Sequence, residues 1–246
     1  DKLILTDSGG FQGWSLPTKK TTDGIIFKNI YDGSSFLMTP EISIKTQNLL
    51  GSDIAMIFDY VVDIDAAHDI QTDAIKTTDS WARIAKETHN NNNQAMFGII
   101  QGGLIKNLRE QSALSMVKLN FDGYALGGLA LGETRVERKN IVNFTTEYLP
   151  TNKPRYVMGL GDTLGLIDLI EEGIDMFDCV WPARLARHGK LITGNSYINI
   201  KNQKYIEDSR PIYESCPCFT CQNYSRGFLR HLLRNEQTSA WLYLTI

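Results

Sequence analysis

Three aspartates, Asp7, Asp59 and Asp178, each follow a short apolar run that is typical of a buried β-strand. Carboxylates gathered at one site can divide the roles of nucleophile, general acid or base, and recognition group when their surroundings separate their pKa values. A single aspartate after a strand often only caps the next helix. Three of them in equivalent positions favour a catalytic site.

An amide and glycine-rich turns follow the other strand-like runs. These are Gln101-Gly102-Gly103, Gly127-Gly128-Leu129 and Gly159-Leu160-Gly161. A carboxylate accepts hydrogen bonds from ring N–H and amino groups, whereas an amide and exposed backbone N–H groups donate to a carbonyl. The combination suits the edge of a planar heterocyclic base. Phe11, Tyr124 and Met158 offer faces for stacking, although such residues beside strands are more often part of the core.

Three of the four cysteines, Cys216, Cys218 and Cys221, lie close together in the sequence. Outside secreted proteins, a C-x-C-x-x-C cluster favours three thiolate ligands of a structural zinc ion over a disulfide framework. A tetrahedral site needs a fourth ligand. His231 is the visible candidate, but a surface or packing histidine explains it equally well.

Apolar runs of strand length alternate with helix-like segments along the chain. The runs cover residues 2–6, 53–58, 95–100, 123–126, 155–158 and 174–177, and the helical segments cover 40–50, 72–88, 105–119, 135–148 and 163–172. This alternation predicts βαβ units and a parallel sheet, either doubly wound or closed as a (β/α)8 barrel. Polar groups at the end of every run favour the barrel, because barrel enzymes collect catalytic groups from the carboxyl ends of several strands. Six units are visible.

The chain has 246 residues, of which 42% are apolar and 22% charged, and its net charge is -3. This length buries a substantial core without disulfides. No apolar run approaches the ~18 residues of a membrane span, so we expect a cytoplasmic protein. Residues 184–234 hold nine Lys and Arg against three acidic residues, which indicates either a polyanionic partner or a solvated basic face.

Six stretches resemble the motifs of the tRNA-guanine transglycosylase family, in the family's order and across essentially the whole chain. They are residues 6–12, 51–54, 98–103, 123–133, 175–180, and the cysteine cluster with 223–226. The resemblance implies a (β/α)8 TIM barrel with a zinc-binding subdomain. It also implies an enzyme of queuosine biosynthesis that exchanges guanine at the first anticodon position of tRNA for a 7-deazaguanine base.

The resemblance assigns roles to individual residues. Asp178 would be the nucleophile that forms a covalent aspartyl-ribosyl intermediate, and Asp7 the general acid and base. The base would contact Ser8, Phe11, Asp59, Gln101, Gly128, Leu129 and Met158, the tRNA anticodon loop would contact Arg184 and Arg187, and zinc would bind Cys216, Cys218 and Cys221. The family commonly forms homodimers, so we expect one here.

Two departures from the family's motifs bear on the substrate. Residues 59–63 resemble the eukaryotic pattern more than the bacterial one. Leu131 stands where eukaryotic members carry Gly, which makes room for the bulky cyclopentenediol of queuine, and where bacterial members carry Val. Leu131 narrows that space. We therefore predict the small 7-aminomethyl-7-deazaguanine as the substrate base, with queuine as the alternative.

The extent of the chain also departs from the family. Six units are visible instead of eight, and by resemblance the first two βα units of the barrel are the absent ones. By resemblance, barrel units occupy residues 1–200 and a zinc-binding subdomain occupies 201–246, truncated at its C-terminus. The fourth zinc ligand is then expected just after Ile246, and His231 matches a different position of the family that is not a ligand.

Three other functions are weighed against this prediction. A non-catalytic tRNA-binding subunit of the same family is disfavoured because both Asp7 and Asp178 are present. A two-carboxylate glycoside hydrolase is disfavoured by the glycine-rich strand ends and the cysteine cluster. The archaeal relatives that act on the tRNA D-loop resemble these motifs less closely.

Overall fold

The computed structural model describes residues 2–194 and 196–246. The chain divides into two compact units, Asp1–Asp178 (unit 1) and Cys179–Ile246 (unit 2). The predicted division into residues 1–200 and 201–246 stays a prediction.

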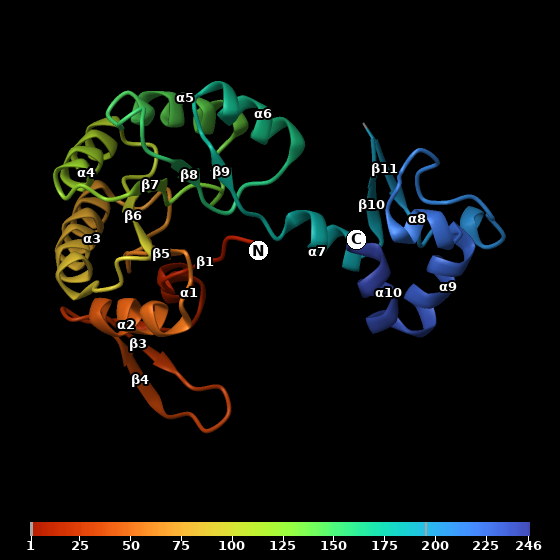
Figure 1. The fold of residues 1–246 in the computed structure, drawn as a ribbon, viewed down its shortest axis with the longest axis horizontal. Coiled ribbons are helices and arrows are strands. Elements are labelled where there is room, and N and C mark those ends of the chain that lie inside the picture. Colours follow the sequence, from red (N-terminus) through yellow and green to blue (C-terminus); the bar gives the residue numbers. More distant parts are fainter. Residues whose placement is uncertain (1, 195) are drawn as a thin grey trace. The chain divides into compact units, whose positions relative to one another are not determined.

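Unit 1 is built on one parallel sheet of six strands in the order β1-β5-β6-β7-β8-β9. The strands are β1 (Leu5–Thr6), β5 (Ile54–Met56), β6 (Ala95–Ile100), β7 (Gly123–Leu126), β8 (Arg155–Val157) and β9 (Met176–Phe177). Each lies within or overlaps one of the six predicted runs, so the predicted parallel sheet is confirmed. The sheet curls into a half-barrel (Figure 1). A closed barrel of eight strands stays a prediction.

Five helices cover the outer face of this curled sheet (Figure 1). They are α2 (Pro40–Leu50), α3 (His68–Thr88), α4 (Lys106–Lys118), α5 (Arg135–Thr146) and α6 (Thr163–Glu171), and all five predicted helical segments are confirmed. Local sequence sets their ends. Thr39 caps α2 ahead of Pro40, Thr134 and Glu137 form a capping box on α5, and Asp162 caps α6.

The core of unit 1 lies between the sheet and these helices. It includes Met56, Ile99, Leu126 and Val157 from the strands and Met116 from α4, all at most 1% exposed. Parallel strands covered in this way are nearly continuous apolar runs, which is why the sequence pattern locates them so well.

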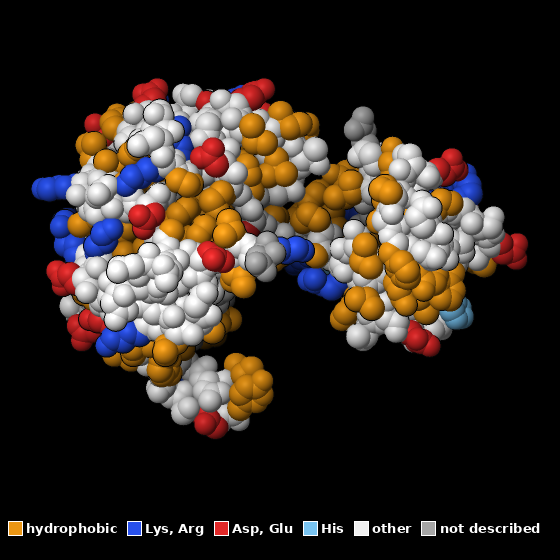
Figure 2. Space-filling view, in the orientation of Figure 1, with side chains coloured by type: hydrophobic (Ala, Val, Ile, Leu, Met, Phe, Trp, Pro, Cys, Tyr) orange, Lys and Arg blue, Asp and Glu red, His pale blue; other side chains and the backbone are white. Residues whose placement is uncertain are grey.

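Two small parts of unit 1 have no counterpart among the predicted elements. A one-turn-and-a-half helix, α1 (Gly10–Ser15), follows β1, and an antiparallel sheet joins β2 (Lys19–Lys20), β3 (Ile25–Lys28) and β4 (Ser35–Met38). Helix α1 is too short to show a helical period, and the antiparallel strands lie outside the alternation of strands and helices that predicts the parallel sheet. Figure 2 shows hydrophobic side chains at the tip of the β3–β4 hairpin, where Ile30 and Tyr31 are almost fully exposed.

Unit 2 combines a hairpin with short helices. Its elements are α7 (Trp181–Arg187), β10 (Lys190–Thr193), β11 (Ser196–Asn199), the 3-10 turn η1 (Gln203–Tyr205), α8 (Phe219–Asn223), α9 (Arg226–Asn235) and α10 (Gln237–Leu244). Leu229, Leu232 and Leu233 place one face of α9 in the core of this unit. In the described parts of both units, no helix combines the length and the apolar character that crossing a membrane requires.

Candidate active site

The polar groups that follow the strands meet along one edge of the unit 1 sheet. Asp7, Gln101 and Asp178 come directly after β1, β6 and β9, and Gly127–Leu129 come directly after β7. Because all six strands are parallel, their carboxyl ends lie at the same edge. The topology thus brings together side chains that are far apart in the sequence.

Asp59 and Gln101 form a buried hydrogen-bonded pair at this edge. Gln101 Nε2 donates to Asp59 Oδ2 at 2.6 Å, and the two residues are 4% and 3% exposed. Burial raises the pKa of Asp59 to about 7, and the negative charge of Asp7 adds to the increase, while the bond from Gln101 opposes it. Asp59 is therefore poised to exchange its proton near neutral pH.

Two glycines permit the close packing around this pair. A Cβ atom on Gly10 would lie 1.9 Å from Asp59 Oδ1, and one on Gly128 would lie 2.6 Å from Gln101 Oε1. Gly128 also has a φ of +63°, in the left-handed region that favours glycine. The glycine-rich sequence is thus a steric requirement of the carboxylate-amide pair.

Asp178 is held by two donors that act on the same carboxylate oxygen. Tyr156 Oη donates to Asp178 Oδ1 at 2.6 Å, and the backbone N–H of Gly159 donates to it at 2.8 Å. Burial, followed by the bond to Asp178 and the charges of Asp178 and Asp7, raises the pKa of Tyr156 far above its usual range. The phenol therefore stays a donor at any physiological pH. Among the described residues, Oδ2 accepts no hydrogen bond and is free to react.

Asp7 is exposed, and its carboxylate lies close to Asp59 and to Tyr156. Its negative charge contributes to the raised pKa of Asp59 and to that of Tyr156. The neighbouring Ser8 is buried, and its backbone oxygen accepts a bond from Ser43 Oγ at 2.9 Å. The structure thus gathers Asp7, Asp59 and Asp178, as the sequence pattern predicts.

The predicted contact residues for a base differ in exposure. Phe11 on α1 is 47% exposed and Met158 is half-buried against the core, so both leave surface for a ligand. Leu129 is buried and packs in the core. Tyr124, offered above as a possible stacking face, is fully buried and belongs to the core.

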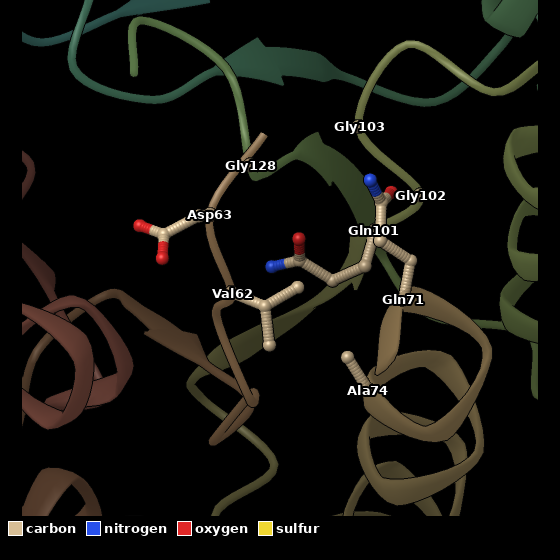
Figure 3. A pocket seen from close by; sticks show the side chains of 8 residues that line it. All are labelled: Val62, Asp63, Gln71, Ala74, Gln101, Gly102, Gly103 and Gly128. Carbon is tan, nitrogen blue, oxygen red and sulfur yellow. The ribbon is translucent and has the colours of Figure 1, made fainter. Parts of the chain in front are cut away.

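A small cavity of about 10 Å³ adjoins the amide of Gln101 (Figure 3). Its lining comes from the segment after β5, from α3, and from the loops after β6 and β7, and consists of Val62, Asp63, Gln71, Ala74, Gln101, Gly102, Gly103 and Gly128. This volume has room for about one water molecule. It is far too small for a purine-sized base.

The sequence analysis did not identify Arg109, which is fully buried on α4. Its Nε and Nη1 atoms donate to the backbone oxygens of Gly103 and Ile100 at 2.8 and 3.0 Å, and Ser112 Oγ accepts from the Gln101 N–H at 3.0 Å. Burial lowers the pKa of Arg109 to about 9, opposed by the charge of Glu133. These bonds fix the Gln101–Gly103 turn. The available signal was the presence of Arg109 and Ser112 on the face of α4 that otherwise carries the apolar Leu108, Ala113 and Met116.

Glu133 and Tyr156 were also not identified as site residues. The Glu133 carboxylate accepts from the backbone N–H groups of Ala130 at 2.7 Å and Leu131 at 3.0 Å. It thereby stabilises a turn in which Ala130 has a φ of 59°, unusual for a residue other than glycine. Tyr156 is in β8, two residues before Met158, and the alternation of strand side chains is the signal that would place it beside the site.

The three clustered cysteines of unit 2 fit a metal ion. The Sγ atoms of Cys216, Cys218 and Cys221 lie within 4.8 Å of one another, and among the described residues no histidine or carboxylate joins them. The Cys221 N–H donates to Cys218 Sγ at 3.5 Å and holds the pKa of that thiol below its usual value. Three converging thiols are a donor set that soft metals such as Zn²⁺ prefer. His231 lies elsewhere on α9, where its ring contacts Asn235.

Arg184 and Arg187, the predicted tRNA contacts, lie in the last turn of α7 with exposed side chains. Neither has an ion pair among the residues that the structure describes. Both guanidinium groups are therefore available to an anionic ligand.

Comparison with known proteins decides the family of this chain. The family model described as queuine tRNA-ribosyltransferase matches residues 1–246. The chain belongs to the queuine tRNA-ribosyltransferase family. It is 46% identical over 241 residues to the queuine tRNA-ribosyltransferase of Lysinibacillus sphaericus and 46% identical over 243 residues to that of Caldanaerobacter subterraneus subsp. tengcongensis. The Bacillus licheniformis protein of the same name is 45% identical over 241 residues.

Membership of the queuine tRNA-ribosyltransferase family confirms the resemblance inferred from the motifs. The matches cover 97%, 98% and 97% of this chain, and 63%, 65% and 63% of the three relatives. The chain thus spans less than two thirds of the length of these relatives.

Proposed function

We propose that this protein is a tRNA-guanine transglycosylase that replaces guanine at the first anticodon position of tRNA with a 7-deazaguanine base. The observation that carries the proposal is the arrangement at the strand-end edge. An exposed carboxylate with one free oxygen, Asp178, shares this edge with a buried carboxylate-amide pair, Asp59 and Gln101. The first group suits attack on a sugar, and the second suits recognition of a base.

The proposed reaction has two displacements at the anomeric carbon of the ribose. Asp178 Oδ2 attacks this carbon, the glycosidic bond breaks, and guanine leaves with the bonding electron pair and takes a proton from Asp7. The product is an aspartyl-ribosyl ester. The incoming base then gives a proton to Asp7, its nitrogen attacks the same carbon, and Asp178 departs as a carboxylate. The two donors on Oδ1 orient the carboxylate for both steps.

Recognition of the base relies on the position of Asp59 and on its protonation. A buried carboxyl group with a pKa of about 7 ionises readily when a base supplies N–H donors to it. Ser8, Phe11, Met158 and the backbone at Gly128 and Leu129 complete the proposed contacts. A base reaches such a site only when it is splayed out of its stack, so the anticodon loop must present it unpaired.

We propose 7-aminomethyl-7-deazaguanine as the substrate base and queuine as the alternative. The half-buried Leu131 lies two residues after Leu129, whose carbonyl would face the substituent of the base, and the Leu131 N–H donates to Glu133. A leucine side chain at this point leaves less room for a bulky substituent than glycine does.

Unit 2 would contribute a metal site and contacts with tRNA. Cys216, Cys218 and Cys221 would hold a structural Zn²⁺, which would rigidify the segment between η1 and α8. Arg184 and Arg187 would bind the phosphates or bases of the anticodon loop. The active protein would be a homodimer with a closed (β/α)8 barrel.

The test is exchange of labelled guanine into an anticodon stem-loop, using the protein expressed from its complete gene and loaded with zinc. The proposal predicts incorporation of label that the aminomethyl base competes away. Tight binding of the stem-loop without exchange would instead indicate a non-catalytic tRNA-binding subunit.

A further inference from the structure

One arginine on α5, Arg138, joins two loops of the candidate active site. Its Nε atom lies 2.6 Å from Glu133 Oε1, in the segment after β7, and its Nη1 atom lies 3.6 Å from Asp162 Oδ1, in the segment after β8. The side chains of Arg138 and Glu133 are 14% and 0% exposed. No role in the reaction described above uses this ion pair.

The first of these loops depends on Glu133 for its conformation. Both carboxylate oxygens of Glu133 accept backbone bonds, from the N–H groups of Ala130 and Leu131. In a trans peptide the N–H and C=O groups point in opposite directions, and the structure has no cis peptide bond among its described residues. The Leu129 carbonyl therefore points away from Glu133.

A carboxylate that is fully buried needs a compensating charge to stay ionised and to keep accepting such bonds. Arg138 is the only residue that forms an ion pair with Glu133 among the described residues. Arg109 also senses the charge of Glu133 but has no ion pair with it. Arg138 thus supports the Leu129–Leu131 segment indirectly, by pairing with Glu133.

The second loop leads from β8 to α6. Asp162 caps α6 by accepting from the Gly165 N–H at 3.0 Å. The same loop contains Gly159, whose N–H donates to Asp178. Arg138 therefore contacts the far end of the loop whose Gly159 N–H donates to Asp178, the proposed nucleophile.

We propose that Arg138 is a positioning residue for base recognition: by binding Glu133 and Asp162, it fixes the Leu129–Leu131 backbone so that the Leu129 carbonyl faces the incoming base. The inference rests on the proposed function for its substrate. A Leu129 carbonyl held in this direction selects bases that place a hydrogen-bond donor, such as an aminomethyl group, opposite it. The effect of Arg138 is transmitted through Glu133, without contact between Arg138 and the base.

The chain offers a matched control on the same helix. Arg135 pairs with Asp168 through Nη2 and Oδ1 at 2.7 Å and also ties α5 to α6. Its contacts reach neither loop of the site. Arg135→Met therefore removes an ion pair of the same helix and leaves the Arg138–Glu133 pair in place.

The experiment measures base-exchange kinetics of the intact zinc-loaded protein, with the aminomethyl base as the varied substrate, for wild type, Arg138→Met, Arg138→Lys and Arg135→Met. We expect Arg138→Met to raise KM for the base about tenfold with a smaller change in kcat, Arg138→Lys to recover part of the loss, and Arg135→Met to stay within about twofold of wild type. Equal effects of the two methionine variants, or no change in KM, would overturn the inference.

Amide hydrogen exchange of the same variants gives a readout that does not depend on activity. Arg138→Met should accelerate exchange at the Ala130 and Leu131 amides, and Arg135→Met should not. Unchanged protection of these amides in Arg138→Met contradicts the inference. Inactivity of the wild type would defeat the proposed function and leave this exchange test able to decide the role of Arg138. If Arg138→Met does not fold, Arg138→Lys and Glu133→Gln serve in the same measurement.

Discussion

The strand-end edge of unit 1 and the cysteine cluster of unit 2 are built in opposite ways. The edge draws on residues from Asp7 to Asp178, which meet because six parallel strands run in register. The cluster spans only Cys216 to Cys221, and its thiols meet because the chain turns once before α8. The edge therefore depends on the whole sheet, whereas the cluster depends on one turn and on the ion that it would bind.

The same contrast exists within the edge between two carboxylates. Asp59 is buried with one amide donor, and burial raises its pKa to about 7. Asp178 is exposed and has two donors on one oxygen. The environment thus favours a proton on the first group and leaves the second available as a nucleophile, which is the separation of roles that paired carboxylates need.

The largest effect is expected for Asp178→Asn. An amide cannot attack the ribose, so guanine exchange should fall by roughly three orders of magnitude or more. Asp175→Asn is the control, because Asp175 accepts from the Arg155 N–H below the site. An equal loss of activity in both variants would contradict a specific role of Asp178, because any substitution next to β9 would then have the same effect.

Removing a cysteine should damage unit 2 and spare the edge. Cys218→Ser should lose bound zinc and lower the stability of unit 2 by about 2 kcal/mol or more, because metal affinity contributes directly to folding. Zinc content and thermal unfolding measure this, with Cys179→Ser, outside the cluster, as the control. Full zinc content in Cys218→Ser would remove that residue from the ligand set.

The buried carboxylate makes a pH-dependent contribution to stability. The pKa of Asp59 rises from 3.8 to about 7 on folding, so the folded state binds more protons between these values. The stability that this group supplies is present at low pH and is lost as pH rises from about 4 to 7. Between pH 5 and pH 8, the free energy of unfolding of wild type, measured in urea, should therefore fall by about 1–3 kcal/mol more than that of Asp59→Asn. The same variant should bind the base more weakly.

The exposed Asp65→Asn serves as the control for this measurement, since it should keep the pH dependence of the wild type. Identical pH profiles of Asp59→Asn and wild type would contradict the buried, partly protonated state of Asp59.

Tyr156→Phe tests the hydrogen bonding of Asp178, the proposed nucleophile. Loss of the bond to Asp178 Oδ1 leaves only the Gly159 N–H on this oxygen, and kcat should fall about tenfold, with KM for the base nearly unchanged. Tyr148→Phe, away from the strand ends, is the comparison. A rise in KM for the base, with kcat unchanged, would instead indicate that Tyr156 contributes to binding of the base.

The smallest effect concerns the choice of base. Leu131→Gly should raise kcat/KM for queuine relative to the aminomethyl base by a few-fold, about 1 kcal/mol, because it enlarges the space beside the Leu129 carbonyl. Competition between the two bases in one reaction measures the ratio directly. An unchanged ratio would exclude Leu131 as a determinant of the substrate.

The sequence predicted the sheet of unit 1 well because buried parallel strands and their covering helices have strong periodic patterns. The runs at 95–100 and 123–126 coincide with β6 and β7, and the segment 40–50 coincides with α2. The strand-end positions of Asp7, Gln101 and Asp178 followed from this pattern and the parallel topology. Helix α1 did not, since it covers fewer than two turns, and the antiparallel hairpin β3–β4 lies outside the parallel βα pattern that located the other strands.

The supporting groups of the site could not be predicted in the same way. Arg109, Glu133 and Tyr156 act through bonds to backbone atoms or to one carboxylate, and their partners depend on side-chain directions that a linear pattern does not contain. The cysteine cluster was predicted because its three thiols are close in the sequence. Tyr124 shows the opposite case, since an aromatic beside a strand end was compatible with either stacking or burial, and it is buried.

The most direct test of the account is to trap the covalent intermediate. The intact protein is incubated with an anticodon stem-loop in the absence of free base and analysed on a denaturing gel, followed by mass spectrometry of the adduct. The account predicts an adduct on Asp178 that forms in wild type and Tyr156→Phe and is absent from Asp178→Asn. Guanine exchange without any adduct, or an adduct that persists in Asp178→Asn, would contradict it.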